Sequence, residues 1–439
     1  MTRFKLFKQS ALVLALGAGV GFNATPLYAA PGLVDVYQMS LLHDATLAQA
    51  RANYDAEREV MTQARSVLLP NISASGSVRH PDISESASSQ AVEIELNQTL
   101  FNREAFSRYD QAKSKMENTE VTYRLAQQSL IVRVSTAYFD VLLAEQNLGL
   151  AKSKLEADKI LWEKAKASSE VGLASRTDVL QARSAYDLTN SNLISAENEL
   201  DIAYEKLSKL TGQSVPQVKQ LVLDIQIEQP RLDKTALELK AEADNLTVRI
   251  AQLQQAVAAE EVEAQKSGHW FNLNLRATHT NTNCNGFTNP GACNDGSNTG
   301  VSIVASIPLY SGGLTSSRVT EARFKSQAAM IGVRDAREQA RLDARVQTRN
   351  LERGFALVAA LREAVKSGEA FLEAAEEGYR VGLRNMIDVV TAQANLFDAQ
   401  SNLAAALHNL LLTQLQLQNT LGDLNVDHLR QLDQLLTNP

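Results

Sequence analysis

Two matching stretches set the plan of this chain: EVGLASRTDV, from Glu170 to Val179, and RVGLRNMIDV, from Arg380 to Val389. Each contains V-G-L and then, after four residues, D-V. The aspartates of the two motifs lie 210 positions apart, as do Gly212 and Gly422. Internal repeats of about 20–50 residues would indicate a solenoid, and this period is far longer. The sequence therefore predicts a tandem duplication of domain-sized units, each with a sharp turn between two long helices.

The start of the chain has the order of a secretory signal peptide over residues 1–29. Three basic residues precede a short apolar run and then small residues, with cleavage after Ala29 or Ala30. Loss of those basic residues takes the formal net charge from −7 to −10. Because phosphate binding needs a basic face, we expect no nucleic acid partner. No later apolar run is long enough for a membrane helix, so the exported chain is predicted to be soluble or to enter a membrane as a β-barrel.

Proline is absent between Pro81 and Pro216 and between Pro308 and Pro439, where good helix formers dominate. These spans predict long helices over 103–169 and 314–379, each about 100 Å long at about 1.5 Å per residue. A second helix follows each turn and ends near the repeated glycine. The second helices carry heptad seams, which indicate lateral packing: Leu193, Ala196, Leu200, Ala203, Leu207 and Leu210 in the first copy, and Leu403, Ala406, Leu410 and Leu417 in the second.

Each copy also begins with a shorter predicted helix, 35–68 or 235–266, followed by two stretches in which polarity alternates. We expect two hairpins of strands about ten residues long, with loops at 80–90 and 280–300. The apolar positions are Ile72, Ala74, Gly76, Val78, Val92, Ile94, Leu96 and Leu100 in the first copy, and Phe271, Leu273, Leu275, Ala277, Val301, Ile303, Ala305, Ile307 and Leu309 in the second.

An ordinary half-buried sheet would explain one such hairpin. The helices are too long to fold back over so small a sheet, however, and strands of about ten residues suit a tilted membrane span. Glu93, Glu95 and Arg276 would then face a water-filled interior. Four strands cannot close a barrel, so a dimer of eight strands or a trimer of twelve is expected. Aromatic residues stand at the helix-side ends of three strands, as in an interfacial belt: Phe101, Trp270 and Tyr310.

Over roughly 33–435 the chain resembles the TolC family of outer-membrane exit ducts. The resemblance rests on the order and spacing of many short marks rather than on one motif. These marks are Ala64-Arg65-Ser66 before Leu68-Leu69-Pro70, Thr136-Ala137-Tyr138-Phe139, the two V-G-L turns with their D-V pairs, and Ile307-Pro308-Leu309-Tyr310 with Gly312-Gly313.

The resemblance implies a mainly α fold with β: a tandem-repeat protomer of a trimeric outer-membrane β-barrel, four strands per chain, continued by a long periplasmic α-helical barrel. Repeats would cover 33–212 and 235–422, with a linker at 213–234 and a tail at 423–439. The homotrimer would sit in outer-membrane lipid of a Gram-negative bacterium. It would export drugs or proteins received from an inner-membrane transporter through a periplasmic adaptor protein.

Residue roles also follow from the resemblance. A latch of hydrogen bonds and salt bridges would close the periplasmic tip. The latch would use Asp178, Tyr379 and Arg384, with Thr177 and Glu376 nearby. Asp388 matches one acidic ring at the constriction, and Thr391 stands where a second ring is expected. Leu161 replaces a polar residue of the latch network. The adaptor-contact residues would be Val171, Gly172, Leu173, Val381, Gly382 and Leu383.

Several simpler explanations remain open at this point. Ser175-x-x-Asp178 and Asn385-x-x-Asp388 both look like helix N-cap boxes, a role compatible with the gate. Cys284 and Cys293 are expected to form a disulfide in an exported protein, with free thiols or a metal site as alternatives. The scattered histidines give no metal, cofactor or catalytic motif, so we expect no enzyme. The rival class is a soluble periplasmic coiled-coil scaffold or adaptor.

Overall fold

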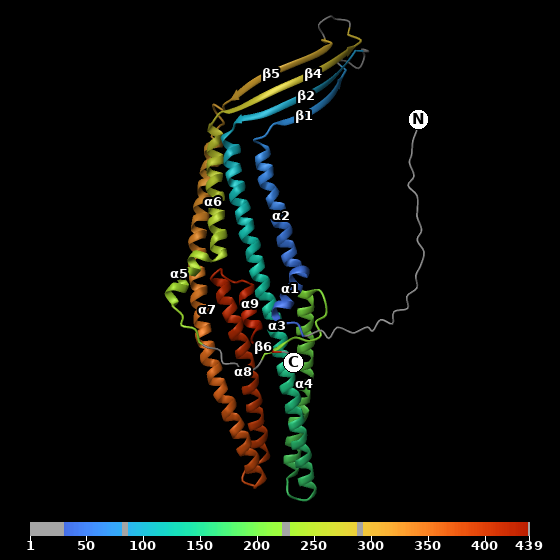
Figure 1. The fold of residues 1–439 in the computed structure, drawn as a ribbon, viewed down its shortest axis with the longest axis vertical. Helices are drawn as coiled ribbons and strands as arrows, with labels where there is room; N and C mark the ends of the chain where they lie inside the picture. The colour runs from blue at the N-terminus through green and yellow to red at the C-terminus, as the bar shows by residue number, and fades with distance from the viewer. Residues whose placement is uncertain (1–29, 81–86, 222–228, 288–292, 438–439) are drawn as a thin grey trace, which may run out of the picture.

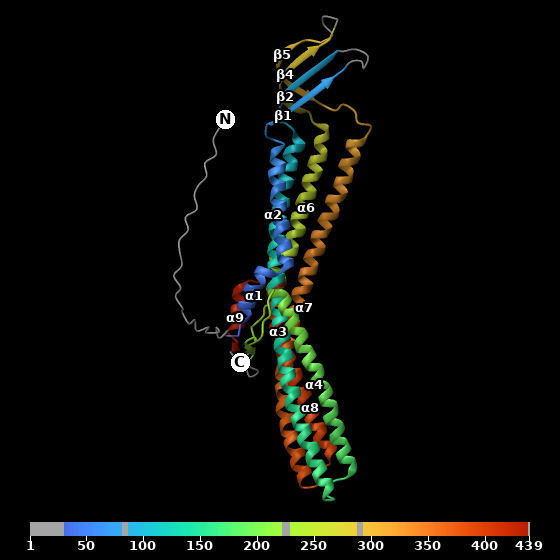
Figure 2. The same cartoon turned by 90° about the vertical axis from the view of Figure 1, so that its right-hand side faces the viewer.

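The computed structural model describes residues 30–80, 87–221, 229–287 and 293–437. The predicted signal peptide, 1–29, lies outside the described residues. The protein is a long rod with a small sheet at one end and two helical hairpins at the other (Figures 1 and 2). No helix in the described ranges combines the length and apolarity needed to cross a membrane.

Two helices run nearly the full length of the rod: α3 (Arg103–Glu170) and α7 (Leu314–Arg380). Each packs, among other contacts, against one helix toward the sheet and another toward the tip. Helix α3 packs against α2 (Ala45–Ser66) toward the sheet and α4 (Arg176–Thr211) toward the tip. Helix α7 packs in the same way against α6 (Leu246–Lys266) and α8 (Met386–Thr420). The predicted long helices and heptad seams are confirmed, since Ala196, Leu207, Leu403 and Leu410 are all buried.

The predicted continuous helices 35–68 and 235–266 are wrong, because each is broken once. Helix α1 (Leu33–His43) ends before α2, and α5 (Lys234–Asp244) ends before α6. Asp44 and Asn245 cap the following helices by accepting hydrogen bonds from backbone N–H groups, at 2.6 Å from Leu47 and 2.8 Å from Thr247. The breaks face the ends of α4 and α8, where Gly212 and Gly422 sit against His43 and Asp244. Helix α4 thus ends beside the break between α1 and α2, and α8 ends beside the break between α5 and α6.

The sheet contains β1 (Asn71–Arg79), β2 (Ser88–Phe101), β4 (Asn272–Asn285) and β5 (Gly296–Ser306). Its antiparallel order is β1-β2-β4-β5. The predicted 280–300 loop is wrong at both ends, because β4 reaches Asn285 and β5 starts at Gly296. These strand ends are polar on both faces, so alternation could not reveal them. Strand β5 stops before Pro308, which has no N–H for a ladder.

The register places the predicted apolar residues on one face. Ile72, Leu96, Ala277 and Val301 lie side by side across the four strands, and the adjacent row is Ser73, Glu95, Thr278 and Gly300. Ile72 and Val301 are 68% and 71% exposed. The sheet therefore presents an apolar face that stays exposed within the described part of the chain.

Short elements gather half-way along the rod. Strand β3 (Gln220–Leu221), in the predicted linker, pairs with β6 (Leu436–Thr437). Helix α9 (Val426–Asp433) lies in the predicted tail, 423–439, just before β6. These elements and α1 pack on the fully buried Tyr138 and Phe139 of α3, which form the largest core of the chain. The linker prediction for 222–228 lies outside the described residues.

Candidate functional site

The two V-G-L turns form the end of the rod opposite the sheet (Figure 1). Gly172 and Gly382 both adopt φ of +79°, a left-handed conformation that favours glycine. In each turn the following leucine N–H donates to a carbonyl five residues back, at 2.8 Å, which ends α3 or α7. The side chains of Leu173 and Leu383 are 84% and 83% exposed. The backbone of each turn therefore holds one leucine side chain, Leu173 or Leu383, in solvent.

The predicted N-cap boxes are confirmed at both turns. Ser175 Oγ accepts from the Asp178 N–H at 3.1 Å, and the Asp178 carboxylate accepts from the Ser175 N–H at 2.9 Å. Asn385 and Asp388 exchange the corresponding bonds at 2.9 and 3.3 Å. Both aspartates therefore fix the start of a helix, and each also places a negative charge near the tip.

The structure gathers only part of the predicted latch. Burial and, to a lesser degree, the Asp178 carboxylate of the first repeat raise the pKa of Tyr379 in the second repeat. Arg384 lies 3.9 Å from Asp388 in its own hairpin, and no ion pair joins it to Asp178 among the described residues. Thr177 and Glu376 are exposed. Within one protomer, Arg384 therefore lies beside Asp388 rather than Asp178.

A buried polar network that sequence reasoning missed joins α3 to α4. Asp158 is 1% exposed, and its Oδ2 accepts from Lys154 Nζ at 2.8 Å and from Thr189 Oγ1 at 2.6 Å. Lys154 also donates to Thr189 at 2.8 Å. The i, i+4 spacing of Lys154 and Asp158 was the available signal, but such pairs are usually solvated. The network fixes the register of the first hairpin.

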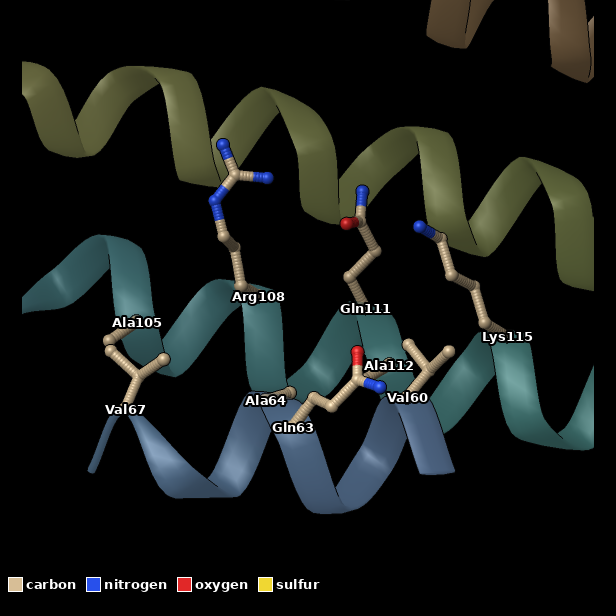
Figure 3. Close-up of a pocket in the computed structure, with 9 residues that line it drawn as sticks. All are labelled: Val60, Gln63, Ala64, Val67, Ala105, Arg108, Gln111, Ala112 and Lys115. Carbon is tan, nitrogen blue, oxygen red and sulfur yellow. The ribbon is translucent and has the colours of Figure 1, made fainter. Parts of the chain in front are cut away.

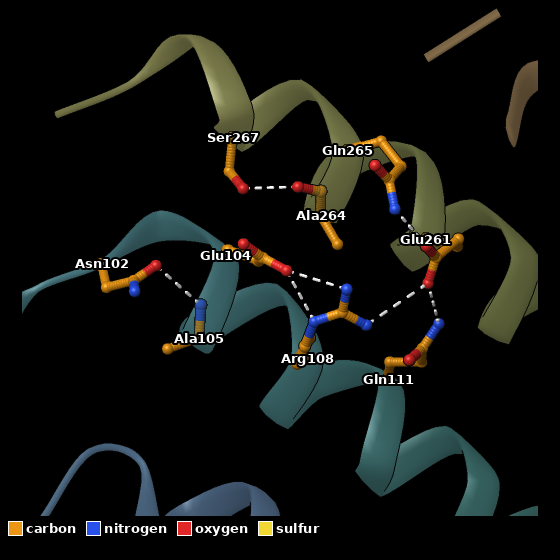
Figure 4. Close-up of polar contacts among 9 residues, drawn as sticks. All are labelled: Asn102, Glu104, Ala105, Arg108, Gln111, Glu261, Ala264, Gln265 and Ser267. Atoms are coloured by element: carbon orange, nitrogen blue, oxygen red, sulfur yellow. Dashed lines mark hydrogen bonds and ion pairs between the residues drawn. The ribbon is translucent and has the colours of Figure 1, made fainter. Parts of the chain in front are cut away.

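A second polar network ties α3 to α6 just below the sheet (Figure 4). Its centre is Glu261, which accepts from Gln111 at 2.9 Å and Gln265 at 2.6 Å and lies 3.7 Å from Arg108. Figure 3 shows Arg108, Gln111 and Lys115 pointing toward α6 from a shallow pocket of about 250 Å³ between α2 and α3. The described residues contain no group of three or more side chains suited to a metal ion.

The sheet end carries the remaining predicted features. Cys284 and Cys293 form a disulfide, as expected, and the Cys284 N–H donates to Asp295 at 2.8 Å. Glu95 and Arg276 form a 2.8 Å ion pair on the polar face. Aromatic side chains cluster where the strands meet the helices, with the Phe101 ring centroid 5.0 Å from Phe271 and 6.2 Å from Trp270.

Comparison with known proteins then decides the family. The family model described as "Outer membrane efflux protein" matches residues 36–213 and 239–423. The chain belongs to the outer membrane efflux protein family. Each of the two matched ranges contains one V-G-L turn, so the family model matches this chain once on each side of residues 214–238.

Relatives agree over nearly the whole chain. The outer membrane protein TolC of Escherichia coli K12 is 31% identical over 438 residues, which cover 95% of this chain and 87% of TolC. TolC of Vibrio cholerae is 32% identical over 426 residues, covering 95% and 96%. The crystal structure of the outer membrane protein VceC from V. cholerae superposes with a TM-score of 0.77 at 17% identity, covering 89% of this chain and 96% of that one.

These findings confirm the predicted fold class and localisation. This protein is an outer-membrane export channel of a Gram-negative bacterium, and its helices extend into the periplasm. The rival scaffold or adaptor class is excluded, because the family match and the structural match both span the sheet and the two helical repeats.

Proposed function

We propose that three copies of this chain form one conduit that carries drugs and proteins out of the cell. The observation that carries the proposal is the sheet with one exposed apolar face and one polar face, mounted on helices about 100 Å long. Strands β1 and β5 are the edges of this sheet, and open edges are not tolerated in lipid. Neighbouring copies would pair these edges and turn the polar face into a lumen.

The helices support the same arrangement. Large apolar side chains on α4 and α7 are exposed in the described part of the protomer, with exposed fractions of 64% at Leu188 and 67% at Phe324. A copy on each side would bury them and extend the lumen as an α-helical barrel. Repeat boundaries at 33–212 and 235–422 fit this plan. Each repeat supplies two strands, one helix that runs the length of the rod, and shorter helices that pack along it.

At the tip, Val171, Gly172 and Leu173 with Val381, Gly382 and Leu383 are proposed to receive the helical hairpins of a periplasmic adaptor protein. The exposed leucines suit an apolar helix groove. An inner-membrane transporter would deliver the cargo. Arg384 of one protomer would bind Asp178 of the neighbouring protomer when the tip is closed, with Thr177, Tyr379 and Glu376 around the pair. Asp388 and Thr391 would line the constriction.

A deletion strain complemented with the wild-type gene tests this function. We expect the deletion to increase drug sensitivity and to abolish secretion of at least one exported protein. The purified protein should need detergent, migrate as a trimer and conduct in planar bilayers. Arg384→Ala and Tyr379→Phe should each raise the single-channel conductance. A protein that fractionates as a soluble periplasmic monomer would refute the conduit, whereas unchanged conductance in both variants would refute only the latch.

A further inference from the structure

We propose that the tip of each protomer is held closed by an apolar clamp between its own two hairpins, in addition to any polar latch between copies. The clamp consists of side chains from both repeats: Leu161, Ala165 and Ala182 from the first, and Tyr379, Met386 and Val389 from the second. This inference rests on the proposed gated conduit and concerns how its closed state is stabilised.

Leu161 and Tyr379 hold the clamp together, because both belong to each of two neighbouring apolar clusters. One cluster contains Met386, which is fully buried, together with Ala165 and Ala182. The other contains Val389 at 2% exposure, with Ala375 and Ala392. Side chains from α3, α4, α7 and α8 therefore meet within about three helical turns of the V-G-L turns.

Polar bonds contribute little to this contact between the hairpins. Among the described residues in the half of the rod that ends at the V-G-L turns, one side-chain hydrogen bond joins the two hairpins. Ser401 donates it to Asn147 at 2.9 Å. Asn147 is 14 residues before Leu161, about 20 Å along α3. Asp178 uses its carboxylate on Ser175, and Arg384 lies beside Asp388. Apolar burial is therefore the main attraction at the tip within one protomer.

Each hairpin behaves as a unit on its own side of the clamp. In the first hairpin the buried Asp158 and Thr189 bind α3 to α4 above Leu161, together with the half-buried Lys154. In the second, Gly368 lets α7 approach α8 so closely that an added Cβ would lie 3.3 Å from Leu396 Cδ1. Separation of the two units at the clamp breaks fewer directed bonds than separation of α3 from α4. Opening is thus expected to part the apolar surfaces of Leu161 and Met386.

Single-channel recording on the intact duct, purified from outer membranes, tests the clamp. We expect Leu161→Ala and Met386→Ala each to increase the open fraction about tenfold, as removal of a packed apolar side chain does. Salt screens ion pairs but does not weaken apolar contacts. The ratio of each variant to wild type should therefore be the same in dilute and concentrated KCl, whereas the effect of Arg384→Ala should shrink as salt rises.

Matched variants control for indirect effects. Ile160→Ala alters the neighbouring, 44% exposed position on α3 and should leave gating unchanged. Met386→Leu keeps the apolar volume and should stay closed. If Leu161→Ala does not assemble as a trimer, Leu161→Val provides a smaller change with the same expected direction. If the Leu161 variants have the same open fraction as Ile160→Ala, the proposed clamp is wrong. Failure of the wild type itself to form channels would instead overturn the proposed conduit.

Discussion

Removal of the Asp158 carboxylate should destabilise the first hairpin far more than removal of an exposed acid from the same hairpin. Asp158→Ala deletes the acceptor of Lys154 Nζ and of Thr189 Oγ1. Lys154 is 14% exposed, so its charge remains largely desolvated with only the Thr189 hydroxyl as partner. Breaking one side of a buried pair destabilises by about 3–5 kcal/mol. The second carboxylate oxygen, Oδ1, is buried and has no hydrogen-bond partner among the described residues. Because Asp158→Ala also removes this unpaired oxygen, we expect a destabilisation at the lower end of that range, about 3 kcal/mol.

Hydrogen exchange of α3 and α4 amides near Asp158 and Thr189 measures this loss locally. A loss of about 3 kcal/mol corresponds to roughly hundredfold faster exchange through local opening. Asp187→Ala is the matched control, because its 3.6 Å pair with Arg183 is 63% and 61% exposed. Such surface pairs contribute about 0–1 kcal/mol.

Replacement of both charges separates pairing from packing. Lys154→Met with Asp158→Leu removes the pair and fills its space with apolar side chains. The double variant should exchange at close to the wild-type rate or more slowly, since apolar replacement of a buried ion pair is often neutral or stabilising. Equal exchange rates in Asp158→Ala and Asp187→Ala would refute the reasoning that this network holds α3 to α4.

Three further predictions concern the pore, the loop and the middle of the rod. Thr391→Asp should strengthen block of the channel by multivalent cations, because it would add a carboxylate one helical turn from Asp388; equal block before and after the change would contradict this. Mass spectrometry of non-reduced protein should find no free thiol at Cys284 or Cys293. Burial lowers the pKa of His408 to about 4, so its contribution to stability is present above about pH 6.5 and is lost as the pH falls toward 4. His408→Phe should flatten that acid-side loss of thermal stability, and an unchanged slope would contradict it.

The long elements of this fold were predictable because local signals and tertiary structure agree. Proline at 81, 216 and 308 brackets the helical spans, and the Asn102 and Gly212 caps mark their ends. Strand alternation gave the correct faces because one face of the sheet is uniformly apolar. The strand ends beyond Thr280 and before Gly300 are polar on both sides, so the same signal vanished there.

The breaks at Asp44 and Asn245 were not predictable from periodicity, because helix-forming sequence continues on both sides of each. What decides them is the end of a neighbouring helix far along the chain, seen in the contact of Gly422 with Asp244. The features of the candidate site also fall into a group that could be predicted from local sequence and a group that could not. The turns and caps are local and were predicted, whereas the apolar clamp depends on how segments separated by the full repeat meet.

The two repeats differ where their hairpin helices are joined, and this difference bears on which hairpin would move in the proposed gate. The offset of 210 positions relates Lys154 to Ala364, Asp158 to Gly368 and Thr189 to Ala399. Directed bonds hold α3 and α4 in one register, since each needs a defined donor and acceptor geometry. Close apolar contact at Gly368 holds α7 and α8 together without fixing such a geometry. The second hairpin can therefore adjust its helix register more easily, and it is also the hairpin that carries Asp388 and Arg384. A rigid first repeat and an adjustable second repeat are what a gate with a fixed frame and a moving part requires.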